Sequence, residues 1–188
     1  NLDRSLLEPY EELITIYIRE NLPGKAEPLL IELARRDEDQ PGHQNRLAGF
    51  YESQNQFKKA EAIFQTMVTE SGNTDTNAIL ALARFHLRTR NFAAAIESYQ
   101  NALARNNSPD IRSELAAAQI DAGKITEADK LLTDILSENS SHAGALFQRC
   151  RLLVRQAEYP EALKHLEHYI TIRKNNAAAY YLKAVSLI

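Results

Sequence analysis

The sequence contains one cysteine, Cys150, and only six glycines in 188 residues. A single cysteine excludes an internal disulfide framework. There are no tandem glycines and no GxxxxGK[ST] pattern, so the usual loop for holding a nucleotide phosphate is lacking. No apolar run approaches the ~18–20 residues of a membrane-spanning helix, and we expect no membrane span in this chain.

The sequence also lacks a large excess of either positive or negative charge. Lysine and arginine together number 22, aspartate and glutamate 25, and the formal net charge is −3. A general nucleic-acid-binding role lacks the basic footprint that it needs, so we expect no nucleic acid among the partners. Hydrophobic residues make up 44% and charged residues 25%, a balance typical of a folded, helix-rich chain.

A helical hairpin over residues 44–64 is the pattern around which the rest of the chain is organised. A polar run at residues 53–56 interrupts an apolar 3.6-residue periodicity, which then resumes. When the chain is aligned on Ala60 of this hairpin, small residues appear at equivalent positions in five hairpins: Ala26, Ala60, Ala95, Ala128 and Ala162. Their spacings are 34, 35, 33 and 34 residues. Recurrence near ~34 residues, with two helices per unit, predicts a helical solenoid.

These hairpins resemble the tetratricopeptide repeat, whose pattern is W-x2-L-G-x2-Y, then A-x3-F, then P. The motifs that carry the resemblance include Leu47-Ala48-x2-Tyr51 with Ala60-x3-Phe64, Leu82-Ala83-x2-His86 with Ala95-x3-Tyr99, and Leu115-Ala116-x2-Gln119 with Ala128-x3-Leu132. The resemblance, to the prokaryotic multi-repeat type, implies an all-α, right-handed α-solenoid of about five hairpins plus a truncated sixth. It divides a single domain, 1–188, into repeats at approximately 7–40, 41–75, 76–108, 109–142, 143–176 and 177–188.

The chain departs from the family pattern in several places. Ile14 stands where a small residue is usual, and Arg149 stands where leucine is usual. The proline that normally follows the second helix is missing each time, and glycine, asparagine and serine supply the turns instead. We expect the first helix over residues 10–21 and the last over residues 180–188. Because the chain starts at Asn1 rather than methionine, we expect a processed or excised segment.

The recurring small residues have a packing reason. Two helices that cross at an interaxial distance of ~8–10 Å leave room for a methyl group and little more. We therefore expect the alanine of each second helix, Ala95 for example, to be almost fully buried. Four residues of the first helices meet the same limit against the neighbouring repeat: Ala48, Ala83, Ala116 and Cys150.

Candidate catalytic and metal-binding groups are few. His165 and His168, with Glu161 one turn earlier, share a helix face and could hold a metal ion, but their outward phase favours solvated surface. His86 replaces a packing tyrosine and Cys150 occupies a small-residue position, so we expect a core histidine and an inert buried thiol. We expect no catalytic residues, no metal and no cofactor.

The resemblance implies a non-catalytic scaffold that binds a protein or peptide segment on the concave face of the first helices. Carried onto this sequence, the candidate partner-binding residues are Asn45, Asn77, Arg84, Arg88, Asp121, Phe147, Arg151, Arg155 and Tyr181. The same face would include Ser113 and Ala117 in the fourth repeat.

Two arginine pairs on this face suggest an acidic ligand. Arg84/Arg88 and Arg151/Arg155 occupy equivalent positions two repeats apart, roughly 20 Å at a helix spacing of ~10 Å. They could bind an acidic segment of a partner. The alternative is a structural ladder, Arg88–Asp121–Arg155, in which these charges pair among themselves.

One family subtype grips carboxylates with lysine and asparagine one turn apart on a first helix. None of the equivalent pairs matches it: Glu11/Thr15, Asn45/Gly49 and Leu80/Arg84. We therefore do not expect this dicarboxylate clamp.

Two further hypotheses stay open at this stage. The chain could be a regulatory or substrate-docking segment of a larger enzyme, or a self-assembly module. Association through the C-terminal end is favoured by a run of apolar residues, Tyr180, Tyr181, Leu182, Val185, Leu187 and Ile188. We expect a soluble protein, and the compartment stays open between the bacterial cytoplasm and the periplasm or envelope.

Overall fold

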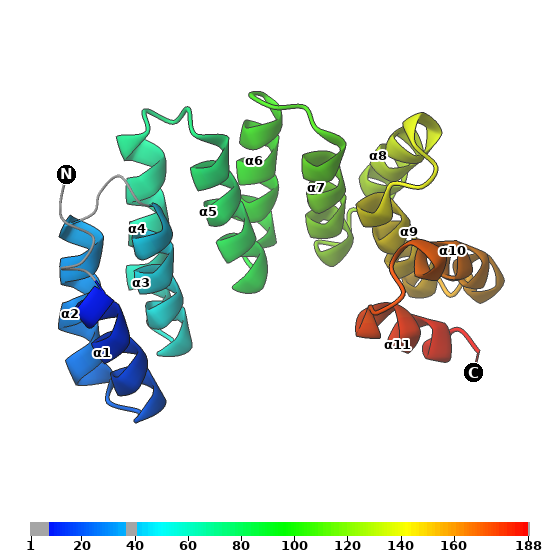
Figure 1. Ribbon diagram of the computed structural model, residues 1–188. Helices are drawn as coiled ribbons and strands as arrows, with labels where there is room; N and C mark the ends of the chain where they lie inside the picture. Colours follow the sequence, from blue (N-terminus) through cyan, green and yellow to red (C-terminus); the bar gives the residue numbers. More distant parts are fainter. Residues whose placement is uncertain (1–7, 37–40, 188) are drawn as a thin grey trace. The chain divides into compact units, whose positions relative to one another are not determined.

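A computed structural model describes residues 8–36 and 41–187 of the chain. This part of the chain forms eleven α-helices and no strand, which confirms the all-α prediction (Figure 1). The helices are α1 (Glu8–Arg19), α2 (Pro23–Arg36), α3 (Pro41–Ser53), α4 (Phe57–Glu70), α5 (Thr76–Arg88), α6 (Phe92–Leu103), α7 (Pro109–Asp121), α8 (Ile125–Glu138), α9 (Ala143–Arg155), α10 (Tyr159–Ile172) and α11 (Ala177–Val185).

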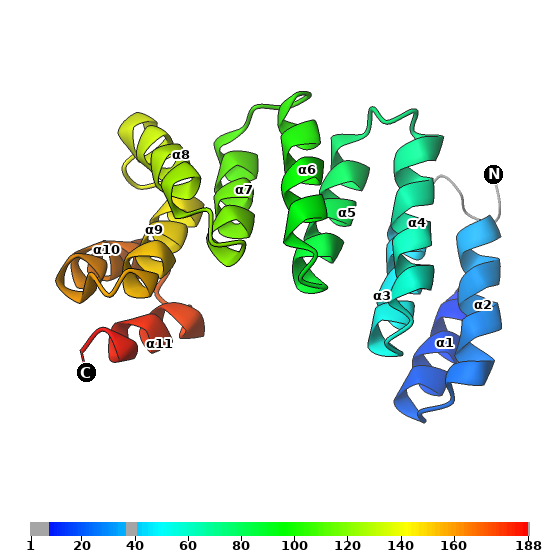
Figure 2. The same ribbon diagram turned by 180° about the vertical axis from the view of Figure 1, so that it is seen from behind.

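The chain divides into two compact units, Asn1–Leu82 and Ala83–Ile188. In the first unit, α2 packs against α1 and α3, and α3 packs against α4. In the second unit, α7 packs against α6, α8 and α9, and α9 packs against α8, α10 and α11. Figure 2 shows α11 beside α10 and α9 at the C-terminal end of this unit. Each unit is therefore a series of packed helical hairpins, as the repeat pattern predicts.

The small residues that set the repeat register are buried. The alanines of the five second helices are 0% exposed: Ala26, Ala60, Ala95, Ala128 and Ala162. So are the four small residues predicted on the first helices: Ala48, Ala83, Ala116 and Cys150. Ile14 is also fully buried, so the larger side chain is accommodated in the first hairpin. The predicted packing role of these positions is confirmed.

The core of the second unit draws on three helices at once. One cluster contains Ala116 and Ile120 of α7, Ala128, Leu132 and Ile135 of α8, and Ala145 and Leu152 of α9. A second cluster joins α9 and α10 to α11 through Leu146, Cys150, Leu166, Tyr169 and Ala179. Each hairpin therefore buries its apolar surface against the next hairpin as well as within itself, which is the source of stability in repeat arrays.

A polar cluster joins three helices of the first unit. The Tyr51 hydroxyl in α3 donates a hydrogen bond to Glu27 Oε1 in α2 at 2.9 Å, and Lys59 Nζ in α4 donates to the same oxygen at 2.9 Å. The bonds from Lys59 and Tyr51 hold the pKa of Glu27 below its ordinary value. Burial, and then the bond to Glu27, raises the pKa of Tyr51 to about 12. At neutral pH the phenol is therefore a donor and the carboxylate an acceptor, as these bonds require.

The turn inside each hairpin has the same backbone conformation. One residue, five positions before the buried alanine, has a positive φ in all five hairpins: Asn21, Asn55, Arg90, Gly123 and Ala157. The next amide then closes the helix, as when Asn91 N donates to His86 O at 2.8 Å and Glu158 N donates to Leu153 O at 2.9 Å. Asparagine and glycine tolerate this conformation readily, whereas arginine and alanine adopt it at a cost.

Some helix boundaries differ from those predicted. Helix α1 runs over Glu8–Arg19 rather than residues 10–21, and α11 covers Ala177–Val185 rather than residues 180–188. The earlier start of α11 has a local cause, because the Asn176 side chain accepts a hydrogen bond from Ala179 N at 3.0 Å and caps the helix. Residues 1–7, the link at 37–40 and Ile188 lie outside the described residues, and the exact repeat boundaries stay a prediction. No helix in the described ranges is both long and apolar enough to cross a membrane.

Candidate partner-binding face

The nine candidate residues all lie on the first helices of their hairpins or on α11. In the first unit, Asn45 of α3 and Asn77 of α5 are exposed. In the second unit the exposed candidates are Arg84, Arg88, Arg155 and Tyr181, and the half-buried ones are Asp121, Phe147 and Arg151. None of the nine is buried, so all of them can be reached from solvent.

Arg84 is held by a carboxylate that the sequence pattern had not singled out. Its Nε and Nη2 donate to Glu114 Oε2 and Oε1 at 2.8 and 2.5 Å, from α5 to α7. The hydroxyl of Tyr99, itself 1% exposed, donates to Glu114 Oε2 at 3.1 Å. The bonds to Glu114 raise the pKa of Arg84, and burial together with the negative charge of Glu114 raises the pKa of Tyr99. Glu114 thus fixes the Arg84 side chain and satisfies a buried phenol.

In the predicted ladder Arg88–Asp121–Arg155, Asp121 pairs with a different arginine of α9. Asp121 Oδ1 accepts from Arg151 Nη2 at 2.6 Å, so Arg151 rather than Arg155 is the α9 partner of this carboxylate. Arg155 Nη1 instead donates to the backbone carbonyl of Ile120 at 2.7 Å. That carbonyl belongs to the last turn of α7, where the negative end of the helix dipole favours a cation.

Two residues expected on this face are buried instead. Ser113 is 4% exposed and Ala117 is 6% exposed. For Ser113 the reason lies at Gly144 of α9, where an added Cβ would come within 2.8 Å of Ser113 Oγ. Helices α7 and α9 approach so closely there that Ser113 lies in their contact rather than in a groove.

The C-terminal end is only partly apolar and exposed. Tyr181 is 69% exposed and Leu187 is 67% exposed. Leu182, which we expected at this surface, packs instead against the cluster formed by α9 and α10. Phe147 belongs to the same region, with its ring centroid 5.3 Å from that of Tyr169 in α10.

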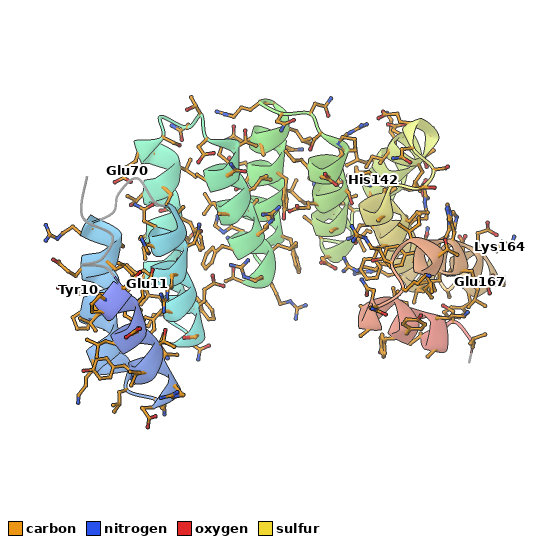
Figure 3. The ribbon with its side chains drawn as sticks, viewed as in Figure 1. Tyr10, Glu11, Glu70, His142, Lys164 and Glu167 are labelled. Carbon is orange, nitrogen blue, oxygen red and sulfur yellow. The ribbon has the colours of Figure 1, made fainter. Side chains whose placement is uncertain are left out.

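The groups considered for catalysis or metal binding have structural surroundings. His86 is 6% exposed, and Cys150 is fully buried with its pKa raised to about 12 by burial, so neither offers a reactive group to solvent. On α10, Glu161 accepts from Lys164 at 2.7 Å (Lys164 is labelled in Figure 3), and His168 Nε2 lies 3.3 Å from Ser141 Oγ.

His142, labelled at the start of α9 in Figure 3, has two polar partners. Its Nδ1 accepts from Ala145 N at 3.1 Å, and its Nε2 lies 3.1 Å from Asp110 Oδ1. The histidine therefore serves as a helix cap. Within the described ranges, no group of three histidine, cysteine, aspartate or glutamate side chains is placed to hold a metal ion.

A signal for the missed ion pair is present in the sequence. Arg84 and Glu114 are 30 residues apart, and so are Asp121 and Arg151. With a repeat of ~34 residues, two residues 30 apart occupy positions that differ by about one helical turn on neighbouring first helices. Their side chains can therefore meet between those helices. Searching for opposite charges at this separation would have found both pairs.

Comparison with known proteins places this arrangement in a family. Residues 53–135 match the family model described as anaphase-promoting complex, cyclosome, subunit 3, and residues 119–185 match the model described as tetratricopeptide repeat. The Hsp70-Hsp90 organizing protein 1 of Glycine max is 32% identical over 104 residues. That alignment covers 55% of this chain but only 17% of the relative, so the chain corresponds to a small part of that protein.

Solved structures of low sequence identity share the fold. A tetratricopeptide repeat protein from Parabacteroides merdae has a TM-score of 0.69 at 15% identity, covering 96% of this chain and 72% of the other. A thermophilic tetratricopeptide repeat protein from Thermus thermophilus has a TM-score of 0.69 at 13% identity, covering 96% and 98% of the two chains. These similarities confirm the solenoid fold predicted from the sequence. Because the two family matches span the buried alanines of α4, α6, α8 and α10 in repeat register, the chain belongs to the tetratricopeptide repeat family.

Proposed function

We propose that this chain is a non-catalytic scaffold whose first helices bind a segment of a partner protein. The fold supports a protein-interaction role in general, and helical repeats offer an extended row of side chains for it. The observation that carries the finer proposal is the state of Arg84 and Arg151. Both guanidinium groups are held in place by Glu114 and Asp121, yet their side chains remain 50% and 29% exposed.

The proposed partner segment is acidic. An arginine has five N–H donors, and the bonds from Arg84 to Glu114 engage only Nε and Nη2. Its Nη1 can therefore bind a ligand carboxylate without giving up the pair with Glu114. A guanidinium that is already oriented loses less side-chain entropy when a ligand binds. The partly exposed pairs thus support both interpretations of the sequence, a structural network that also presents donors to a partner.

The test is a double charge reversal, Arg84→Glu with Arg151→Glu. Acidic peptides selected from a displayed peptide library on the unmodified chain serve as the probe, and fluorescence anisotropy measures their affinity. We expect the affinity to fall at least tenfold, about 1.4 kcal/mol, and to weaken with added salt because exposed charges are screened. Arg84→Gln with Arg151→Gln removes the same donors without placing like charges beside Glu114 and Asp121.

A matched control reverses two lysines on second helices, Lys130→Glu with Lys164→Glu. Both lysines are exposed, on α8 and α10, and the net charge changes by the same amount. This variant should bind the peptides as the unmodified chain does. Normal binding by the arginine variants with helicity intact would show that the charges of Arg84 and Arg151 serve the fold alone. Loss of binding in the lysine control would show that binding depends on net charge rather than on the two arginines, and would contradict the proposed site.

Self-association through α11 is a second candidate function, favoured by the exposure of Tyr181 and Leu187. Replacing both residues with glutamate should shift the chain toward monomer in sedimentation equilibrium. A chain that is monomeric at high concentration before any substitution excludes this candidate.

A further inference from the structure

A pocket lies in the first unit between the end of α1, with the turn that follows it, and the second half of α3, and we name it the α1–α3 pocket. Its volume is about 270 Å³, and Ile18, Leu22 and Phe50 contribute apolar side chains to its walls. Ile18 and Leu22 are 48% and 40% exposed, so a ligand can reach both side chains. Because a cavity of ~150 Å³ can hold a benzene molecule, this pocket has room for one large apolar side chain.

One charged residue, Arg46, lines this pocket. Its Nη2 donates to the Thr15 hydroxyl of α1 at 3.1 Å, and the Thr15 hydroxyl in turn donates to the carbonyl of Glu11 at 2.8 Å. In the described part of the chain, Arg46 is hydrogen-bonded to this hydroxyl, whereas Arg84 and Arg151 each pair with a carboxylate. The pocket therefore combines apolar walls with a positive charge that can bind an anionic partner.

The pocket is open at Gly49, which lies between Arg46 and Phe50 on α3. A Cβ added at Gly49 would meet nothing within 4 Å. Backbone of the ligand can therefore approach the helix closely at this point. The same opening allows the pocket to be filled by substitution without disturbing the core.

The spacing of the two recognition elements fits an extended ligand. Arg46 and Phe50 are one turn apart, so they are separated by ~6 Å along the axis of α3. In an extended chain, side chains two residues apart point the same way and are separated by ~6.5 Å. An apolar side chain in the pocket would therefore place a carboxylate two positions away beside Arg46.

We propose that the α1–α3 pocket binds an extended partner segment in which a bulky apolar residue lies two positions from an aspartate or glutamate. This inference rests on the proposed function, because it assigns a partner chemistry to the first unit of the same scaffold. It adds a site, Arg46 with Gly49 and Phe50, that the candidate residues did not include.

The probe is a synthetic peptide with a leucine–serine–aspartate core, flanked by serine and glycine and capped at both ends so that no terminal carboxylate competes. Titrated into the isotope-labelled 188-residue chain, it should shift the amide resonances of Ile18, Gly49 and Ser53 in a saturable way. The variant Arg46→Gln should weaken the affinity about tenfold and reduce its salt dependence. A peptide with asparagine in place of aspartate should bind the unmodified chain about tenfold more weakly. Its affinity for the Arg46→Gln variant should differ little from that of the aspartate peptide, because the two changes remove the same interaction.

A steric variant tests the pocket itself. Gly49→Leu fills it from α3, where leucine also has the higher helix propensity, and should weaken peptide binding at least tenfold with the fold intact. Gly42→Leu is the matched control, because Gly42 is on the same helix, is exposed, and also has nothing within 4 Å of an added Cβ. The control should bind as the unmodified chain does.

The outcomes separate this inference from the proposed function. Absence of shifts at Ile18, Gly49 and Ser53, or unchanged binding by Gly49→Leu, overturns the pocket. If the binding of acidic peptides still depends on Arg84 and Arg151 in that case, the proposed scaffold function is unaffected. Shifts confined to the pocket, with no effect of the Arg84 and Arg151 variants, support the pocket and contradict an acidic site on the second unit.

Discussion

Replacement of Leu152 by alanine is expected to lower the free energy of unfolding by about 2–5 kcal/mol. Leu152 is 0% exposed and belongs to the cluster in which α7, α8 and α9 meet. The substitution removes apolar contacts within this cluster, and the surrounding backbone cannot collapse fully into the space that is left. Urea titration followed by far-UV circular dichroism measures the loss.

The matched control for this prediction is Leu187→Ala. Leu187 is 67% exposed, so the same change should alter the free energy of unfolding by no more than about 0.5 kcal/mol. Because repeat arrays can unfold in parts, hydrogen exchange of the α8 and α9 amides gives a local measure of the same effect. Equal losses in the two variants would contradict the packing described for α9.

Enlarging Ala128 to leucine should also destabilise the second unit, by about 1–3 kcal/mol. Ala128 is 0% exposed and lies in the same cluster as Ala116 of α7 and Ala145 of α9. The extra three carbons have no free volume, so the leucine must adopt a strained rotamer or push α7 and α8 apart. The shift of the thermal unfolding midpoint measures this effect.

The control for overpacking is Ala178→Leu, at an exposed position in the first turn of α11. There the added side chain extends into solvent, and stability should change little. An Ala128→Leu variant as stable as this control would mean that the alanine register does not mark the helix crossings.

The sequence determined the helices and their register. The recurrence of Ala60, Ala95 and Ala128 predicted which positions are buried, and each of them is fully buried in the structure. This part is predictable because the crossing of two closely packed helices has room only for a small side chain. A small residue therefore recurs at the same position of each repeat in the sequence. The face on which Arg84 and Arg151 are accessible was carried over from the resemblance to the repeat family, and the structure leaves both side chains accessible.

Only the tertiary structure decided the partners of those charges. Periodicity places Arg151 and Arg155 on one face but does not say which of them reaches Asp121, since that depends on how α7 and α9 are rotated about their own axes. The burial of Ser113 has the same cause, because the close approach of α7 and α9 at Gly144 encloses its side chain. A modest rotation of either helix changes these contacts and leaves the repeat pattern untouched.

The hairpin turns and the α1–α3 pocket likewise belong to the tertiary structure. Arg90 and Ala157 adopt a positive φ that their own side chains disfavour, because both ends of the turn are held by packed helices and the chain must close between them. Side chains from α1 and α3, Ile18 and Phe50 among them, line the pocket, and Gly49 adds no side chain to fill it. The apolar periodicity of a helix predicts which of its residues are buried. The space left between two helices depends on the side chains of both helices and on how closely the helices pack.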